Sequence, residues 1–213
     1  QKYFYQNFLK QNAFIDAGNF SETAIENALN NALNSDINIT EIIDGKSKSG
    51  IKKCFQLLEN IASIELTTAK PEDTEITYKW ASDPEVRKWS FNTNPIVFEK
   101  HKNWFSEKVK DTNCIYFIAR MNNESIGSIR FDLEDNKAII SYLLDPAFHG
   151  RGLGQALLIK GCKTFSVLNF KENQLSEIIG YVSKENFASR KVFENIGFVK
   201  TVEPDKLKYS INI

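Results

Sequence analysis

Three glycines alternate with other residues at positions 150, 152 and 154, a few residues after the run Leu143-Leu144-Asp145-Pro146. A glycine loop that follows a strand and opens a helix lets the backbone approach a ligand closely. The free N–H groups of the first helical turn then attract anions. Arg151 adds a positive charge inside the loop. The pattern predicts a site for a phosphate or a pyrophosphate.

The spacing of these glycines argues against a dinucleotide-binding site. G-x-G-x-G differs from the G-x-G-x-x-G pattern of dinucleotide-binding folds, and the preceding strand follows hairpins instead of opening a parallel β–α–β unit. A tight turn without a ligand is the alternative that the residues alone leave open.

A second motif lies about 30 residues further on, from Asn186 to Phe198. Together with the segment Leu144–Gly154, it resembles the GNAT acetyltransferase superfamily. The acyl-CoA motif of that superfamily reads Arg or Gln, two residues, Gly, one residue, then Gly or Ala, and its closing block contains Asn, Ser and Gly-Phe. The resemblance covers residues 63–213 and implies an enzyme that uses acetyl-CoA as co-substrate, without a metal.

The resemblance also implies roles for individual residues. The backbone of Tyr142, Leu143 and Leu144 would bind the pantetheine arm between two parallel central strands, and Asn186 would lie near that arm. The pyrophosphate would be held by the loop, whose residues are His149, Gly150, Arg151, Gly152, Leu153 and Gly154.

Two positions depart from the family pattern. His149 stands where Arg or Gln is usual, although its backbone amide can still donate a hydrogen bond. Phe193 stands where many members carry a tyrosine thought to protonate the departing thiolate. A phenyl ring cannot donate a proton, so another group or water must do so.

Acetyl transfer requires an amine that has lost its proton and a path for that proton. Tyr181, His101 and Ser141 are the candidates, and for each a structural role is the alternative. His101 has the pKa range of a base but lies in an amphipathic helix pattern. In relatives, the loop that here contains Arg87, Ser90 and Asn92 shapes the acceptor site.

The acceptor is predicted from a narrower resemblance. The runs Lys79–Arg87 and Phe98–Phe105 resemble the branch that acetylates nucleotide-linked amino sugars, best the pseudaminic acid pathway. The resemblance implies a small-molecule acceptor, a UDP-linked 4-amino sugar. Two alternatives stay open: an acetyltransferase of protein N-termini, and an acyl-CoA-binding module without catalysis.

The elements that must position these residues follow from residue periodicity and turn signals. We expect an α+β fold with a mixed, mostly antiparallel sheet and helices on both faces. Strands are predicted at 64–67, 114–120, 125–133, 138–144 and 178–182, with two more around the turn at 203–205. Helices are predicted from Pro71 and Pro84, and over 98–109, 153–168 and 187–195.

Residues 1–62 form a separate segment in this prediction. Apolar residues at four-residue spacing indicate two or three helices, too few for a large core of their own. The segment resembles the C-terminal end of the nucleotide-sugar hydrolase of the same pathway, which implies an upstream hydrolase domain. Because the chain begins at Gln1 and its one methionine is Met121, we expect it to be a piece of a longer protein.

Composition limits the other function classes. Lys plus Arg and Asp plus Glu are both 27 in 213 residues, so no net charge attracts nucleic acid or an anionic membrane. No apolar run approaches the roughly 20 residues of a membrane-spanning helix. Three widely spaced cysteines and two histidines favour reduced thiols in a cytoplasmic protein over a disulfide framework or a zinc site.

Overall fold

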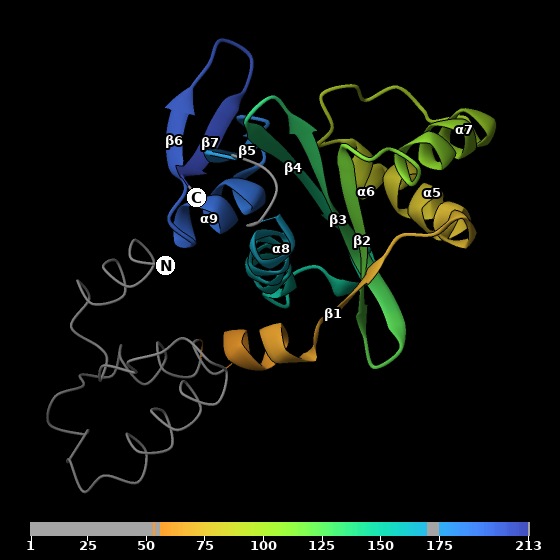
Figure 1. Ribbon diagram of the computed structural model, residues 1–213, viewed down its shortest axis with the longest axis horizontal. Coiled ribbons are helices and arrows are strands. Elements are labelled where there is room, and N and C mark those ends of the chain that lie inside the picture. Colours follow the sequence, from red (N-terminus) through yellow and green to blue (C-terminus); the bar gives the residue numbers. More distant parts are fainter. Residues whose placement is uncertain (1–52, 54–55, 170–174, 213) are drawn as a thin grey trace, which may run out of the picture. The chain divides into compact units, whose positions relative to one another are not determined.

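The computed structural model describes residues 53, 56–169 and 175–212 (Figure 1). The chain divides into two units, Gln1–Cys54 and Phe55–Ile213. The predicted N-terminal helices and their resemblance to a hydrolase therefore lie outside the described residues, apart from a helix over residues 56–63. In the described part of the chain, no helix combines the length and apolarity needed to cross a bilayer.

The described unit is built on a seven-stranded sheet with the order β1-β2-β3-β4-β5-β7-β6. Neighbouring strands are antiparallel except for β4 and β5, which are parallel. The predicted mixed, mostly antiparallel sheet is thus confirmed. Its strands are β1 (Glu65–Thr68), β2 (Cys114–Met121), β3 (Glu124–Glu134), β4 (Lys137–Leu144), β5 (Glu177–Val182), β6 (Val199–Val202) and β7 (Leu207–Asn212).

Tight turns connect β2, β3 and β4. Asn122 and Asn123 have φ values of 51° and 65°, and Asp135 has a φ of 52°. Asn and Asp tolerate this left-handed region better than other side chains, and two such residues in succession match the twist of a two-residue hairpin. The turns predicted at these positions are confirmed.

One face of the sheet is covered by α5 (Thr74–Ser82) and α7 (Phe98–Lys108), which lie side by side, and the short α6 (Pro84–Arg87) follows α5 in the chain (Figure 1). Trp80 from α5 and Phe105 from α7 pack against Tyr116 and Ile118 of β2. The 3-10 turn η1 (Pro71–Asp73) leads into α5.

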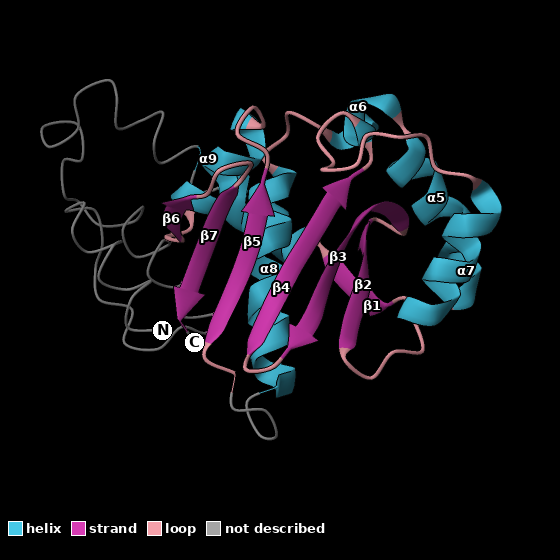
Figure 2. Ribbon diagram, turned by 90° about the horizontal axis from the view of Figure 1, so that it is seen from above, coloured by secondary structure: helices cyan, strands magenta, loops and turns pink. Residues whose placement is uncertain are grey.

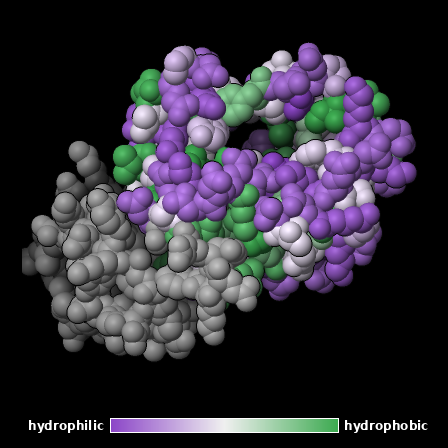
Figure 3. Space-filling model, turned by 45° about the horizontal axis from the view of Figure 1, so that its top comes forward, coloured by the Kyte–Doolittle hydropathy of each residue, from purple (hydrophilic) through white to green (hydrophobic). Residues whose placement is uncertain are grey.

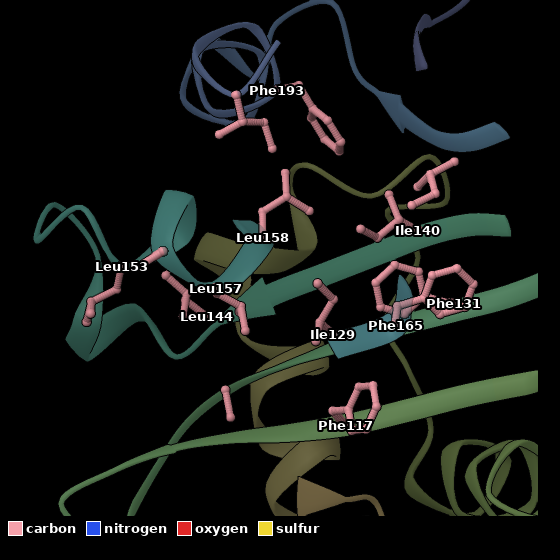
Figure 4. Close-up of a cluster of buried hydrophobic side chains, with 14 of the residues drawn as sticks. Phe117, Ile129, Phe131, Ile140, Leu144, Leu153, Leu157, Leu158, Phe165 and Phe193 are labelled. Carbon is pink, nitrogen blue, oxygen red and sulfur yellow. The ribbon is translucent and has the colours of Figure 1, made fainter. Parts of the chain in front are cut away.

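The opposite face carries α8 (Leu153–Asn169) and α9 (Phe187–Asn195). Figure 4 shows side chains of α8 directed at β3 and β4. The rings of Phe165 and Phe131 stack with their centroids 4.2 Å apart. Successive residues of the central strands point to opposite faces, and apolar residues occur on both. One sheet can therefore support two hydrophobic cores.

Candidate functional site

The two parallel strands at the centre of the sheet separate partway along their length. β4 and β5 pair only where Lys137–Ile140 lies opposite Glu177–Gly180. Beyond that point β4 continues to Leu144 along β3, and β5 continues to Val182 along β7. Figure 2 shows the strands close together at their N-terminal ends and apart at their C-terminal ends. A gap therefore opens between their facing edges.

Backbone polar groups of β4 are directed into this gap. The Asp145 N–H donates to the Ile126 carbonyl at 2.9 Å, which fixes the alternation of hydrogen bonds along β4. Tyr142 and Leu144 then turn their N–H and C=O groups toward β5. The Leu144 carbonyl accepts from His149 Nε2 at 3.1 Å, so this nitrogen carries the ring proton.

Leu143 differs from the prediction that all three residues present their backbone to the gap. It lies opposite Ser128 as a hydrogen-bonded pair, so its N–H and C=O turn toward β3. The side chain of Leu143 packs instead into the core under α5 and α7. The strand alternation leaves Tyr142 and Leu144 as the β4 residues that face the gap.

The glycine loop follows β4 through the short turn η2 (Pro146–Phe148). Gly150 and Gly152 have φ values of 77° and 75°, a conformation that glycine adopts without strain. A Cβ at Gly150 would meet no atom within 4 Å, and at Gly152 only Asn60 Nδ2 at 3.6 Å. The loop is thus an open cradle at the N-terminus of α8, which suits an anion such as a pyrophosphate.

Asp145 anchors the start of this loop. Its Oδ1 accepts from the Ala147 N–H at 2.9 Å, and its Oδ2 accepts from Trp80 Nε1 at 2.9 Å. Trp80 is 1% exposed, so the bond ties α5 to the junction of β4 and the loop. Sequence reasoning identified the Asp-Pro turn but not its tryptophan partner, 65 residues away.

The N-terminal half of α9 lies beside the gap. The Asn186 side chain accepts from the Ser189 N–H at 3.0 Å and so caps the helix. The hydroxyls of Ser189 and Tyr142 lie 3.1 Å apart. The phenyl ring of Phe193 is 2% exposed and contacts the Tyr142 ring edge-on, with the centroids 6.0 Å apart. Burial raises the pKa of Tyr142 to about 12.

Tyr181 and Ser141 lie on the face of the sheet opposite α8 and α9. Ser141 is exposed and pairs across the strands with Arg130, and Tyr181 pairs with Lys208. The two follow the last parallel pair of β4 and β5. These four side chains therefore form one row across the face. Lys206 Nζ lies 4.0 Å from the centre of the Tyr181 ring.

Cations and carboxylates form a network at one end of this row. Asp132 accepts from both Arg130 Nε at 2.7 Å and Lys108 Nζ at 2.8 Å, and Lys108 Nζ also donates to Asp111 at 3.4 Å. The Arg130 guanidinium also lies 5.0 Å from the centre of the Trp104 ring. Figure 3 shows the surface hollowed between the part that carries β6 and β7 and the part that carries α5 and α6.

His101 is placed differently from Tyr181 and Ser141. It is 4% exposed, with its Nε2 3.1 Å from Thr77 Oγ1 and its ring stacked on Phe105 at a centroid distance of 5.9 Å. Burial lowers the pKa of this histidine. Its ring joins α5 to α7, so the geometry favours the structural alternative over a base that reaches an acceptor.

The three predicted acceptor residues lie in and after α6. Arg87 Nε donates to the Asn94 carbonyl at 2.9 Å, and Asn92 Oδ1 accepts from the Asn94 N–H at 2.9 Å. The Ser90 N–H donates to the Arg87 carbonyl at 3.0 Å. These bonds shape the loop, which presents the exposed ring of Phe91.

Comparison with known proteins identifies the family of this domain. A family model described as an acetyltransferase (GNAT) domain matches residues 63–199. The acetyltransferase PseH of Campylobacter jejuni is 25% identical over 146 residues, covering 68% of this chain and 88% of PseH. An uncharacterized protein of Methanocaldococcus jannaschii is 23% identical over 92% of this chain, which spans only 42% of that longer relative.

Solved structures share the fold at low sequence identity. A domain from Methanocaldococcus jannaschii superposes with a TM-score of 0.61 at 22% identity, over 70% of this chain and 98% of that one. Spermidine N-acetyltransferase from Vibrio cholerae, in complex with CoA and spermine, superposes with a TM-score of 0.63 at 16% identity, over 71% of this chain and 96% of that one.

Proposed function

The chain belongs to the GNAT acetyltransferase family, and on this premise we propose that it acetylates the primary amine of a UDP-linked 4-amino sugar of the pseudaminic acid pathway, with acetyl-CoA as donor. The observation that carries the proposal is the gap between β4 and β5 beside an open glycine loop. The similarity to PseH supports the choice of acceptor.

The residues present fit acetyl-CoA. Gly150 and Gly152 leave room for a pyrophosphate against the first amides of α8, while Tyr142 and Leu144 offer backbone groups to the amides of the pantetheine arm. Acetyl-CoA supplies a thioester, an activated acyl group that a neutral amine can attack. As the new N–C bond forms and the C–S bond breaks, the amine must lose a proton and the sulfur must gain one.

Each of these protons has a candidate partner in the site. In this proposal Tyr181 and Ser141 accept the proton of the amine, directly or through water. Their position at the C-terminal side of the last β4–β5 pair supports this role. Phe193 cannot supply the proton for the sulfur. The adjacent Tyr142 is protonated at neutral pH and can donate, with Ser189 as its hydrogen-bond partner. Burial raises its pKa to about 12, which makes it a weaker acid than an exposed tyrosine.

The face of the sheet opposite α8 and α9 carries cationic and aromatic side chains that suit a nucleotide sugar. Arg130 and Lys208 lie in the row and Lys206 lies over Tyr181. Each of these cations is paired with a carboxylate, and a diphosphate would compete for them as a second anionic partner. Phe91 is 60% exposed in the loop after α6, where it can stack on a base or a sugar. A peptide N-terminus, in contrast, would be held by carboxylates near its ammonium group.

Release of free CoA from acetyl-CoA, detected with a thiol reagent, tests the proposal. The UDP-linked 4-amino sugar and a mixture of peptides with free N-termini are compared as acceptors. We expect turnover with the sugar alone. Turnover with peptides alone would instead identify an acetyltransferase of protein N-termini. Binding of acetyl-CoA without turnover of either acceptor would identify a non-catalytic module, consistent with Phe193.

A further inference from the structure

A buried amide upstream of the family-matched region reaches the glycine loop. Asn60 is 8% exposed and lies in the helix over residues 56–63, whereas the family match begins at residue 63. Its Nδ2 donates to the Arg151 carbonyl at 3.1 Å, across 91 positions of sequence. A side chain of this helix is therefore bonded directly to the glycine loop.

The bond determines how one peptide group of the loop is turned. In a planar trans peptide the C=O of Arg151 and the N–H of Gly152 point in opposite directions. With the carbonyl held against Asn60, the Gly152 N–H is directed away from the helix, toward the open side of the loop. Gly152 has a φ of 75°, so the backbone that follows it continues the turn of the glycine loop.

The amide of Asn60 is itself oriented by its neighbour. Gln56 Nε2 donates to Asn60 Oδ1 at 3.3 Å, which places the Asn60 oxygen toward the preceding turn of the helix and its Nδ2 toward the loop. The Asn60 side chain is also the nearest atom that a Cβ at Gly152 would meet. The loop is therefore seated on this amide.

We propose that Asn60 is a positioning residue for acetyl-CoA: it turns the Arg151–Gly152 peptide so that the Gly152 N–H is aimed at the pyrophosphate before the ligand arrives. The inference rests on the proposed use of acetyl-CoA. It also assigns the helix over residues 56–63 to the cofactor site, although that helix precedes the first strand of the sheet.

The test is CoA binding to the full chain, measured by calorimetry, together with steady-state kinetics. Asn60→Leu keeps a similar volume but cannot donate. We expect its Kd for CoA and its KM for acetyl-CoA to rise about 3- to 10-fold, the effect of one lost hydrogen bond, with kcat and the binding stoichiometry unchanged. Glu59→Ala, on the same helix and exposed, is the matched control and should bind as the native protein does.

The outcomes separate this inference from the proposed function. If the native protein does not bind CoA, the proposed function fails. If it binds CoA and Asn60→Leu binds equally well, the positioning role is overturned. A lower melting temperature and lower stoichiometry at unchanged Kd would also overturn it, because they indicate a merely structural role. Should Asn60→Leu fail to fold, Gln56→Ala decides: its Kd should rise about 2- to 3-fold, and an unchanged Kd contradicts the proposal.

Discussion

At the scale of single residues, the side chains that surround Phe193 determine which groups are available to donate a proton in the site. The ring is stacked on Tyr209 with a centroid distance of 5.2 Å and contacts Tyr142 at its edge. A Cβ at Gly180 would collide with the same ring. Phe193 thus lies against both phenols, Tyr142 on β4 and Tyr209 on β7, the two strands that flank β5.

Replacing Tyr142 tests whether its hydroxyl supplies a proton. We expect Tyr142→Phe to lower kcat by about 100-fold, the lower end of what a general acid contributes, with the KM for acetyl-CoA unchanged because the backbone contacts remain. Tyr209→Phe is the control, since this phenol also contacts Phe193 but donates to Glu194 at 2.8 Å. Equal losses in both variants would indicate packing instead of proton transfer.

His101 makes a prediction about stability and pH. Because burial lowers the pKa of His101, the unfolded chain binds a proton more readily than the folded one below the ordinary histidine pKa of about 6.5. The free energy of unfolding should therefore fall as pH drops from 7 through 6.5, and recover as pH rises. Urea unfolding at pH 5.5 and 7.5 measures this difference.

The matched variant for that experiment is His101→Gln, which keeps a hydrogen-bonding group near Thr77 but does not titrate. It should show a smaller loss of stability between the two pH values than the native protein. An identical loss in both would mean that other groups cause the pH dependence. Its kcat, corrected for folded protein, should stay within about threefold, as expected for a histidine with a structural role.

At the scale of elements, the strand β4, the glycine loop and α8 act together. The strand ends where its partner β5 has already diverged, and the loop turns the chain back so that α8 packs across the same strands. The amides at the start of α8 are consequently close to the gap. We propose that this order of elements brings the binding sites for the pyrophosphate and the pantetheine arm together at the C-terminal ends of the two central strands.

Gly152 provides the test of this arrangement. Gly152→Asp adds backbone strain at φ 75° and places a negative charge where an anion is expected, a combined cost of about 2 kcal/mol. The Kd for CoA should rise about 30-fold. Gly152→Ala carries the strain without the charge and should lose less. Unchanged affinity in both variants would contradict the assignment of the loop.

At the scale of the whole molecule, the proposed function uses the two faces of the sheet for different substrates. In this proposal acetyl-CoA occupies the gap and the loop beside α8 and α9, while the acceptor binds the row that contains Tyr181, Ser141 and Lys208 on the opposite face. The two faces meet only where β4 and β5 diverge, so the amine and the thioester can meet there without competing for one surface.

Two lysines near the β6–β7 hairpin allow the two faces of the sheet to be compared. Lys206 lies over Tyr181, on the face proposed for the acceptor. Lys200 lies on the other face, where it is paired across the strands with Tyr209 and forms an ion pair with Glu194 at 3.3 Å. Lys206→Gln should raise the KM for the nucleotide sugar about 5-fold, as the loss of one contact to phosphate implies, with the KM for acetyl-CoA unchanged. Lys200→Gln should change neither constant. A similar effect of both variants would indicate only a change in net charge.

Folding limits how strongly the protein's own cysteines react in the thiol assay. Burial raises the pKa of Cys114 to about 11 and that of Cys162 to about 12, so neither is a thiolate at pH 8, the form that reacts. These two cysteines should therefore add little to the signal from released CoA.

Local sequence patterns determined the elements of this protein. Turn residues with left-handed φ values, apolar periodicity and the glycine loop all act within a few positions along the chain, so the helices, strands and hairpins from β1 to β7 could be predicted. The same local physics predicts the anion site, because a glycine loop and a helix N-terminus are adjacent in sequence.

Only the tertiary structure decided which side chains complete the site. The bonds from Asn60 to Arg151, from Trp80 to Asp145 and between Tyr142 and Ser189 join residues that are 91, 65 and 47 positions apart. The burial of His101 and the turning of Leu143 toward β3 likewise depend on how strands and helices pack. Such contacts follow from the close packing of distant segments, which no local pattern specifies.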